Sequence, residues 1–348
     1  MKWVHECTKK KLIACLVGTS LLITVLITGC TKEEKPPNQM PSTNVNQKEA
    51  FDYDSSWMVY WDNPVEEGLQ NEEDKNLILF ACYFDEKGQL FIPKQLAEMR
   101  ESVKDYSKGK KYLSFVNDIQ YEDGTSKQKD TQLLETIFKD EASMTTYIDC
   151  ILNTVSEWEC DGVEIDFEKI EAGGLWDKYL EFLELLVQKA NKQEKDIRVV
   201  LSSSAPIEEI TLPQGPGYVV MCYNLFGYHS GPGPKADKAF LSQLAKKFSV
   251  LHSVEFALAN GGFEWNEEGK VTRSLKEQQI NAIIKAYDIK PKRDKESQAL
   301  FFEYEEDKEH YTIWYADNKT LKVWKETLQN NYSYIDPVKI SLWRIEGK

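Results

Sequence analysis

The stretch DGVEIDFE, residues 161–168, places four carboxylates in an otherwise apolar segment. Three of its residues have a high strand propensity: Val163, Ile165 and Phe167. The residues that alternate with them are acids: Glu164, Asp166 and Glu168. Because side chains alternate between the two faces of a strand, one face is apolar and the other acidic. This pattern indicates either an edge strand with a solvated acidic face or a strand whose acids line the inside of a barrel.

Eight short runs rich in β-branched and aromatic residues predict strands. They lie at residues 57–61, 77–84, 112–116, 162–168, 197–203, 218–224, 254–260 and 338–344. Helical patterns separate most of these runs, at residues 94–106, 142–158, 176–191, 238–248, 275–287 and 318–329. Strands and helices that alternate in this way are typical of an α/β fold, the (β/α)8 TIM barrel. The acidic strand is then the fourth, and its acids lie inside the barrel.

The segment between the seventh and eighth strands, residues 261–337, is too long for a single crossover. Within it, residues 299–317 contain two aromatic and β-branched runs around a charged turn. This pattern predicts a β-hairpin inserted between strands 7 and 8, which would wall one side of a cleft.

The predicted strands nearly all end in polar or aromatic residues. These residues are Tyr60, Trp61, Asp62, Tyr83, Asn117, Asp118, Glu168, Ser203, Ser204, Tyr223, Asn224, Asn260, Trp343 and Arg344. Catalytic groups of TIM barrels lie at this end of the strands, although any one of these residues could simply begin a loop. As a set they indicate a functional site at the C-terminal face.

The three acids of the fourth strand predict a proton donor. Residues two apart along a strand are separated by about 6.6 Å, so buried carboxylates at this spacing repel one another, and burial raises their pKa. Glu168, the outermost, can donate a proton to a substrate, while Asp166 shares a proton with Glu164 or carries charge beside Glu168. Cleavage of a glycosidic bond needs such a donor. A metal cluster is the rival use, but no histidine lies nearby and the acids are spaced in a line.

The folded body resembles glycoside hydrolase family 18, the chitinases and related endo-acting N-acetylglucosaminidases. DGVEIDFE is similar to the family's strand-four signature Asp-Gly-x-Asp-x-Asp-x-Glu, which ends in the catalytic acid. Three further segments resemble the ends of the fifth, sixth and last strands: SSSAP (202–206), MCYN (221–224) and ISLWR (340–344). The likeness runs from Trp57 to the C-terminus. The hairpin segment resembles the branch that includes bacterial peptidoglycan and spore-cortex glucosaminidases.

The resemblance implies a substrate-assisted mechanism on a glycan that contains N-acetylglucosamine (GlcNAc), without a metal or cofactor. Glu168 would be the acid and then the base, Asp166 would stabilise the acetamido nitrogen, and Tyr223 would hydrogen-bond the acetamido carbonyl. Trp343 would form the floor under the sugar. The remaining predicted substrate-binding residues are Glu164, Asn224, Tyr60 and Asn117.

Two positions depart from the family pattern. Glu164 stands where the chitinases usually have aspartate, which makes the proton relay behind Asp166 one methylene longer. Asn224 replaces the usual aspartate after the tyrosine, which removes a charge near the N-acetyl pocket. Neither change affects Glu168.

The first 30 residues predict export. Three lysines at 9–11 precede an apolar run at 12–27, the layout of a secretion signal. Residues 27–30, Ile-Thr-Gly-Cys, resemble a bacterial lipobox, which implies lipid on Cys30 and an extracytoplasmic, membrane-anchored protein. We therefore expect a signal peptide at 1–29, the lipidated cysteine and a flexible polar tether at 30–55, and a catalytic domain at 56–348.

The composition of the chain limits the partners and the cysteine chemistry that we expect. The net charge of -14 argues against a nucleic-acid partner. Four cysteines of the body (Cys82, Cys150, Cys160 and Cys222) have no metal-ligand spacing, and we expect mostly buried thiols, with one disulfide compatible with export. We expect a monomer.

Two other functions would fit the same barrel. One is a glycan-binding lipoprotein without turnover, and the other is an unrelated barrel enzyme that uses its acids to bind a metal.

Overall fold

The computed structural model describes residues 51–62, 75–171 and 174–345. The predicted signal peptide, Cys30 and the tether up to residue 50 lie outside this part of the chain. Residues 51–55, which the sequence placed in the tether, belong to the folded body: Phe51 is buried in the core and the first strand begins at Ser55. Among the described residues, no helix has both the length and the apolar character needed to cross a bilayer.

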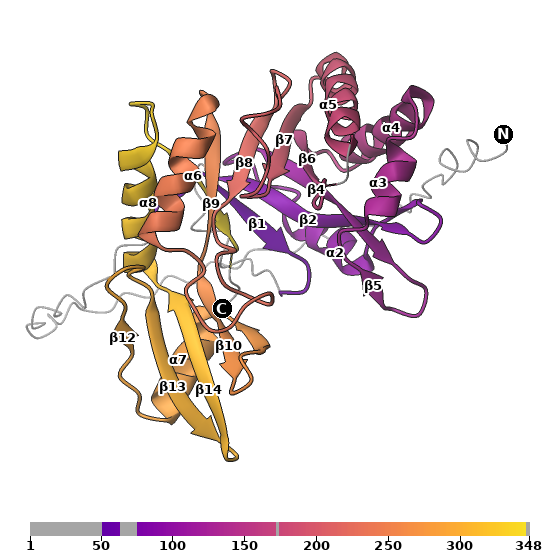
Figure 1. The fold of residues 1–348 in the computed structure, drawn as a ribbon. Coiled ribbons are helices and arrows are strands. Elements are labelled where there is room, and N and C mark those ends of the chain that lie inside the picture. The colour runs from indigo at the N-terminus through magenta and orange to yellow at the C-terminus, as the bar shows by residue number, and fades with distance from the viewer. Residues whose placement is uncertain (1–50, 63–74, 172–173, 346–348) are drawn as a thin grey trace, which may run out of the picture. The chain divides into compact units, whose positions relative to one another are not determined.

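Eight parallel strands form a closed barrel, which confirms the predicted TIM barrel (Figure 1). They are β1 (Ser55–Val59), β2 (Asn76–Asp85), β4 (Lys111–Gln120), β6 (Gly162–Asp166), β7 (Asp196–Leu201), β8 (Gly217–Met221), β9 (Val254–Ala259) and β15 (Lys339–Trp343). Parallel pairing of β1 with β15 and of β2 with β4 closes the ring. Two short strands, β3 (Leu90–Phe91) and β5 (Ser126–Lys127), extend β2 and β4 as antiparallel additions. All eight predicted strands are present.

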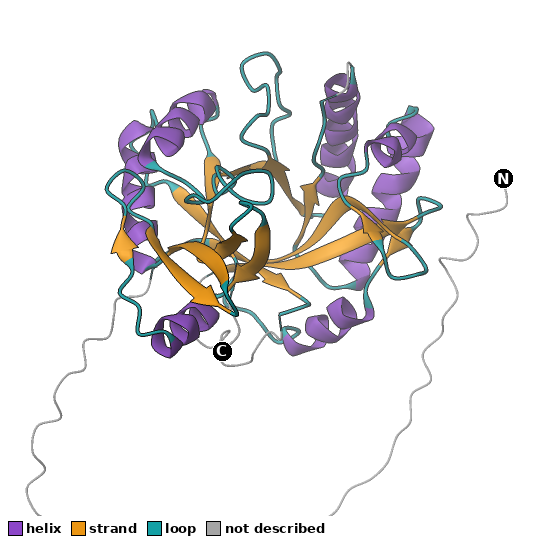
Figure 2. Cartoon of the chain, turned by 60° about the horizontal axis from the view of Figure 1, so that its bottom comes forward, coloured by secondary structure: helices purple, strands orange, loops and turns teal. Residues whose placement is uncertain are grey.

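Helices surround the ring of strands, as Figure 2 shows. They are α2 (Lys94–Ser102), α3 (Thr131–Ile137), α4 (Glu141–Glu157), α5 (Leu175–Lys192), α6 (Lys238–Lys247) and α8 (Asn318–Asn331), with a 3-10 turn at Phe248–Val250. An aspartate side chain caps the N-terminus of α3, α4, α6 and α8. The sequence did not predict α3, because its seven residues are too few for a helical period. Residues 202–216, between β7 and β8, form no helix.

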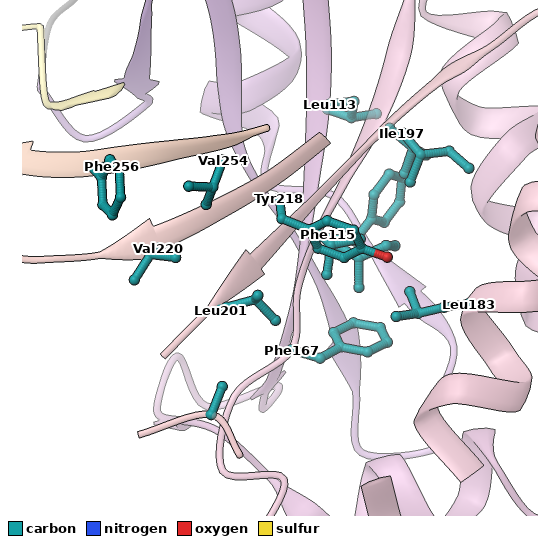
Figure 3. Close-up of a cluster of buried hydrophobic side chains, with 14 of the residues drawn as sticks. Leu113, Phe115, Phe167, Leu183, Ile197, Leu201, Tyr218, Val220, Val254 and Phe256 are labelled. Atoms are coloured by element: carbon teal, nitrogen blue, oxygen red, sulfur yellow. The ribbon is translucent and has the colours of Figure 1, made fainter. Parts of the chain in front are cut away.

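The hydrophobic core forms because side chains alternate between the outside and the inside of the barrel along each strand. The apolar residues of β6 and Phe167, which follows it, face outward: Phe167 lies in the same hydrophobic cluster as Leu183 of α5 and Phe115 of β4 (Figure 3). A smaller cluster fills the barrel interior with residues such as Trp57, Val219 and Met221. The acids of the fourth strand therefore project into the barrel rather than into solvent.

The insertion between β9 and β15 is larger than the predicted hairpin. The hairpin is present as β13 (Leu300–Glu306) and β14 (Glu309–Ala316), but it belongs to a five-stranded antiparallel sheet in the order β11-β10-β14-β13-β12. The other strands are β10 (Gly261–Asn266), β11 (Val271–Leu275) and β12 (Lys292–Arg293). The predicted helix at 275–287 is α7 (Glu277–Ala286), which packs its Ile280 on this sheet and not on the barrel. Since β10 directly follows β9, the inserted lobe begins at the C-terminal face.

Three of the four cysteines of the body are buried thiols: Cys82, Cys160 and Cys222. Burial raises the pKa of Cys160 to about 11. The described part of the chain therefore contains no disulfide.

Candidate active site

Asn117 holds the backbone of Glu168 where β6 has ended. Its Nδ2 donates to the carbonyl oxygen of Glu168 (3.1 Å) and its Oδ1 accepts from the amide nitrogen of Glu168 (2.8 Å). The two strands pair in parallel up to Val116 and Asp166, so this side chain continues the ladder beyond its last backbone pair. Asn117 is only 1% exposed. Asn117 was predicted to bind substrate; in the structure both of its amide atoms bind backbone, and the contacts with Glu168 position that residue.

The carboxylate of Glu168 forms an ion pair with Lys129, whose Nζ lies 2.7 Å from Oε2. The side chain of Glu168 is 19% exposed and that of Lys129 is 38% exposed, so the pair lies at the mouth of the barrel. Lys129 comes from the loop between β5 and α3. The sequence does not predict this contact, because the lysine lies in a loop that has neither a hydrophobic periodicity nor a recognisable motif.

Asp166, the last residue of β6, carries a strongly perturbed carboxyl group. Burial raises its pKa well above the ordinary value, and the negative charges of Glu168 and Glu164 raise it further. Its Oδ1 is buried and has no hydrogen-bond partner among the described residues. Asp166 thus keeps a proton more readily than an ordinary aspartate, and it presents an acceptor that the protein itself does not satisfy.

Glu164 lies deeper in the barrel and is fully buried. Its Oε1 accepts from the indole nitrogen of Trp57 (2.7 Å) and its Oε2 accepts from Nε of Arg198 (3.1 Å). A substrate at the mouth cannot reach this carboxylate, so the prediction of Glu164 as a substrate-binding residue does not fit its position. The two donors also occupy both of its oxygens, which argues against a proton shared with Asp166.

Arg198 joins Glu164 to a second acid, Glu255, which is partly buried. Its Nη1 lies 2.8 Å from Oε2 of Glu255. Burial alone would raise the pKa of Glu255, but the charge and hydrogen bonds of Arg198 outweigh it and lower that pKa. The sequence reasoning missed Arg198 and Glu255, although a charged residue at an inward position of an apolar strand was a signal that could have found them.

The rings of Tyr223 and Trp343 form an aromatic surface beside the acids of the fourth strand. Their rings stack with centroids 6.3 Å apart and planes inclined by 16°. Phe80 and Trp57 pack on Trp343 from the barrel interior, at 5.0 Å and 5.7 Å between centroids. Burial raises the pKa of Tyr223 far above its ordinary value, and the charges of the strand-four acids add to the effect. The phenol therefore remains a hydrogen-bond donor.

Two of the other predicted residues also lie near the mouth. Asn224 follows Tyr223, and its Oδ1 is buried without a hydrogen-bond partner in the described ranges. Tyr60 lies just beyond β1, with its hydroxyl 3.4 Å from that of Tyr83 and its ring edge-on to Trp61. Trp61 is 48% exposed, so its ring is open to a ligand.

Ion pairs of Asp62 connect the end of β1 to the inserted lobe. Asp62 binds Nη2 of Arg344 (2.6 Å) at the end of β15 and Nζ of Lys276 (2.7 Å) just before α7. One acid thus connects two barrel strands and the insertion, which fixes the lobe beside the mouth.

A metal site is not apparent in the geometry. Within residues 51–62, 75–171 and 174–345, no group of three or more histidine, cysteine, aspartate or glutamate side chains is arranged to hold an ion. The side chains of the site can transfer protons, form hydrogen bonds and present an aromatic surface.

Comparison with solved structures finds several proteins with the same fold. The spore cortex-lytic enzyme SleL of Bacillus cereus superimposes with a TM-score of 0.70 at 18% identity, over 85% of this chain and 71% of that one. A chitinase from Chromobacterium violaceum gives 0.67 at 14%, over 85% and 96%. A class V chitinase from Nicotiana tobaccum, solved as a variant in complex with NAG4, gives 0.65 at 10%, over 84% and 94%. The chain shares the fold of these proteins.

Sequence comparison adds one curated relative. The uncharacterized glycosylase YvbX of Bacillus subtilis is 22% identical in an alignment of 267 positions, which covers 72% of this chain and 75% of the relative. No protein-family model matches the chain.

Proposed function

We propose that the protein is a glycoside hydrolase that cleaves β-linked glycans containing GlcNAc by a substrate-assisted, retaining mechanism. The observation that carries the proposal is the meeting of Asp166, Glu168, Tyr223 and Trp343 at the C-terminal end of the barrel. The glycosylase, chitinase and cortex-lytic names of the similar proteins support the same class of reaction. Peptidoglycan, chitin-type chains and N-linked glycans are the candidate polymers.

In the first step, the acetamido oxygen of the bound GlcNAc attacks its own anomeric carbon. Glu168 donates a proton to the glycosidic oxygen, the bond from carbon 1 to that oxygen breaks, and an oxazolinium ion forms. Asp166 and Glu168 carry one proton between them; transfer of it to Glu168 leaves Asp166 ionised, with Oδ1 free to accept the acetamido N–H. Tyr223 donates to the attacking carbonyl oxygen.

In the second step, Glu168 acts as a base on the water that opens the oxazolinium ion. The proton returns to the pair of acids and the sugar leaves with its original anomeric configuration. Asn117 matters in both steps, because it fixes the backbone from which the carboxylate of Glu168 projects.

The proposal is tested by comparing acetylated and deacetylated oligomers of glucosamine as substrates. Only the acetylated oligomers carry the internal nucleophile, so we expect product from these alone, and none from Glu168→Gln. Binding of acetylated oligomers without any product from the wild type would instead support a glycan-binding protein. Cleavage of both kinds of oligomer at similar rates would contradict substrate assistance.

We further propose that the protein is exported and anchored by lipid on Cys30, which the signal-like run at 9–30 supports. In a bacterial host, the full-length chain should incorporate a labelled fatty acid and sediment with membranes, whereas Cys30→Ala should incorporate none. Equal labelling of the two chains would contradict the anchor.

A further inference from the structure

Lys129 contacts the candidate acid but has no part in the two proposed steps. Its Nζ lies 2.7 Å from Oε2 of Glu168. Its backbone nitrogen donates to Oδ1 of Asp118 (2.7 Å), and the next residue, Asp130, donates its backbone nitrogen to the carbonyl oxygen of Asn117 (2.7 Å). Asp130 also caps α3. The backbone on both sides of the lysine is therefore held, and the ammonium is presented to the carboxylate from a fixed loop.

Titratable side chains from several elements act on one another around this ion pair. They are Asp166 and Glu164 of β6, Asp118 of β4, Tyr223 after β8, and Lys169, which follows Glu168 and is exposed. Burial raises the pKa of Asp118 and of Asp166, and thus favours their neutral forms. Of Asp118, Asp166 and Glu168, the last is the one with a cationic side chain in direct contact among the described residues.

This arrangement distinguishes the two acids that share a proton in the proposed mechanism. A positive charge in contact with a carboxyl group favours its ionised form, whereas burial beside other acids favours the protonated form. The first condition holds for Glu168 and the second for Asp166. In the resting protein the proton therefore belongs to Asp166, and Glu168 is ionised against Lys129.

The same charge bears on both chemical steps. When Glu168 gives its proton to the glycosidic oxygen, its negative charge returns beside the ammonium, which favours donation. In the second step Glu168 must be ionised to accept a proton from water, and the ion pair keeps it so at a lower pH. The charge of Lys129 also lowers the pKa of Asp166, although burial and the neighbouring acids outweigh this effect.

We propose that Lys129 is a positioning residue for the shared proton: it keeps Glu168 ionised while Asp166 holds the proton, and it thereby sets the pH range of the reaction. The inference rests on the proposed function and deepens it, because the lysine acts on the reaction through Glu168.

The test compares pH profiles of kcat/KM on N-acetylchitotetraose. Without the ammonium, each ionisation of the pair of acids becomes less favourable, so in Lys129→Met both limbs of the profile should move to higher pH by roughly one unit. On the acidic limb kcat/KM should accordingly fall about tenfold. Lys129→Arg keeps the charge and should stay close to the wild-type profile. Lys139→Met is the matched control, because it removes the same charge from an exposed position at the other end of α3, and its profile should not move.

A lower rate in Lys129→Met with an unshifted profile would mean that the lysine only supports its loop, and would overturn the inference. A second measurement does not depend on turnover: urea unfolding at pH 7 of Lys129→Met, Glu168→Gln and the double variant. The two changes in unfolding free energy should not be additive. Additive changes would contradict the ion pair. If the wild type cut no GlcNAc oligomer, the proposed function would fail, while non-additive changes would still support the pairing of these two residues.

Discussion

The side-chain amide of Asn117 and the backbone of Glu168 form a two-bond pair, 3.1 Å and 2.8 Å long, between residues 51 positions apart in the chain. The pair extends the parallel ladder of β4 and β6 to the candidate catalytic residue. A general acid must be held in a productive position, so a lost backbone contact should affect the reaction more than binding.

We expect Asn117→Ala to lower kcat by about 10- to 100-fold with a smaller change in KM, since the backbone of Glu168 would lose its hold. Asn117→Asp keeps an acceptor for the Glu168 amide but loses the donor, so its kcat should lie between those of the wild type and Asn117→Ala. Steady-state kinetics on GlcNAc oligomers, with thermal unfolding to verify the fold, would measure this. A rise in KM alone would instead assign Asn117 to substrate binding.

Tyr223→Phe should lower kcat by about 100-fold or more and leave KM nearly unchanged. The substitution removes the hydroxyl donor to the acetamido oxygen, yet it keeps the ring that stacks on Trp343. Tyr218→Phe is a matched control, because that hydroxyl donates to the carbonyl oxygen of Pro213, away from the acids. Similar kinetics of Tyr223→Phe and wild type would exclude the phenol from the reaction.

Asp166→Asn should stabilise the folded protein at neutral pH while it removes activity. Burial raises the pKa of Asp166 in the folded state, so the folded protein binds a proton that the unfolded chain releases above the ordinary value of about 3.9. Folding stability from this group is therefore complete below that value and is lost as pH rises. An asparagine at position 166 does not titrate, so the variant does not lose folding stability in this way as pH rises.

The difference in melting temperature between Asp166→Asn and wild type should accordingly widen from pH 4 to pH 8. Asp105→Asn, at an exposed position, controls for the change in net charge. A constant difference across this range would mean that Asp166 does not titrate with a raised pKa.

Arg198→Met should destabilise the protein by about 3–5 kcal/mol, because Glu164 would remain fully buried, and Glu255 partly buried, without a cation. The double variant Arg198→Met with Glu164→Gln should cost less than the sum of the two single changes. Urea unfolding of the three variants would measure the coupling. Additive losses would show that the pair does not interact.

The sequence predicted the barrel because strand alternation is a local property. Val163, Ile165 and Phe167 reveal their outward face within one segment, and the same pattern identifies each of the other strands. It also predicted the positions of Glu168 and Tyr223 at the mouth, since strand ends converge in this fold.

The missed features depend on contacts between distant segments. Lys129 reaches Glu168 from a loop 39 residues earlier, and Arg198 reaches Glu255 across 57 residues. Asn117 was predicted at the strand end where the structure places it, but its contacts with the backbone of Glu168 were not predicted, because the sequence does not show whether a polar rim residue faces ligand or backbone. The inserted sheet was reduced to a hairpin because only one residue lies between β9 and β10, so the sequence pattern did not separate β10 from the barrel strand predicted at 254–260.

Arg198 is shared by two carboxylates, the fully buried Glu164 and the partly buried Glu255, so the ion group beneath the mouth has more negative than positive charge. The electrostatic potential that it creates extends upward through an interior from which water is largely excluded, and there it is weakly screened. A sugar whose anomeric centre becomes cationic would be stabilised by this potential before any individual residue contacts it. The floor of the barrel, far from the broken bond, would in this way favour the charge-separated transition state over the neutral substrate.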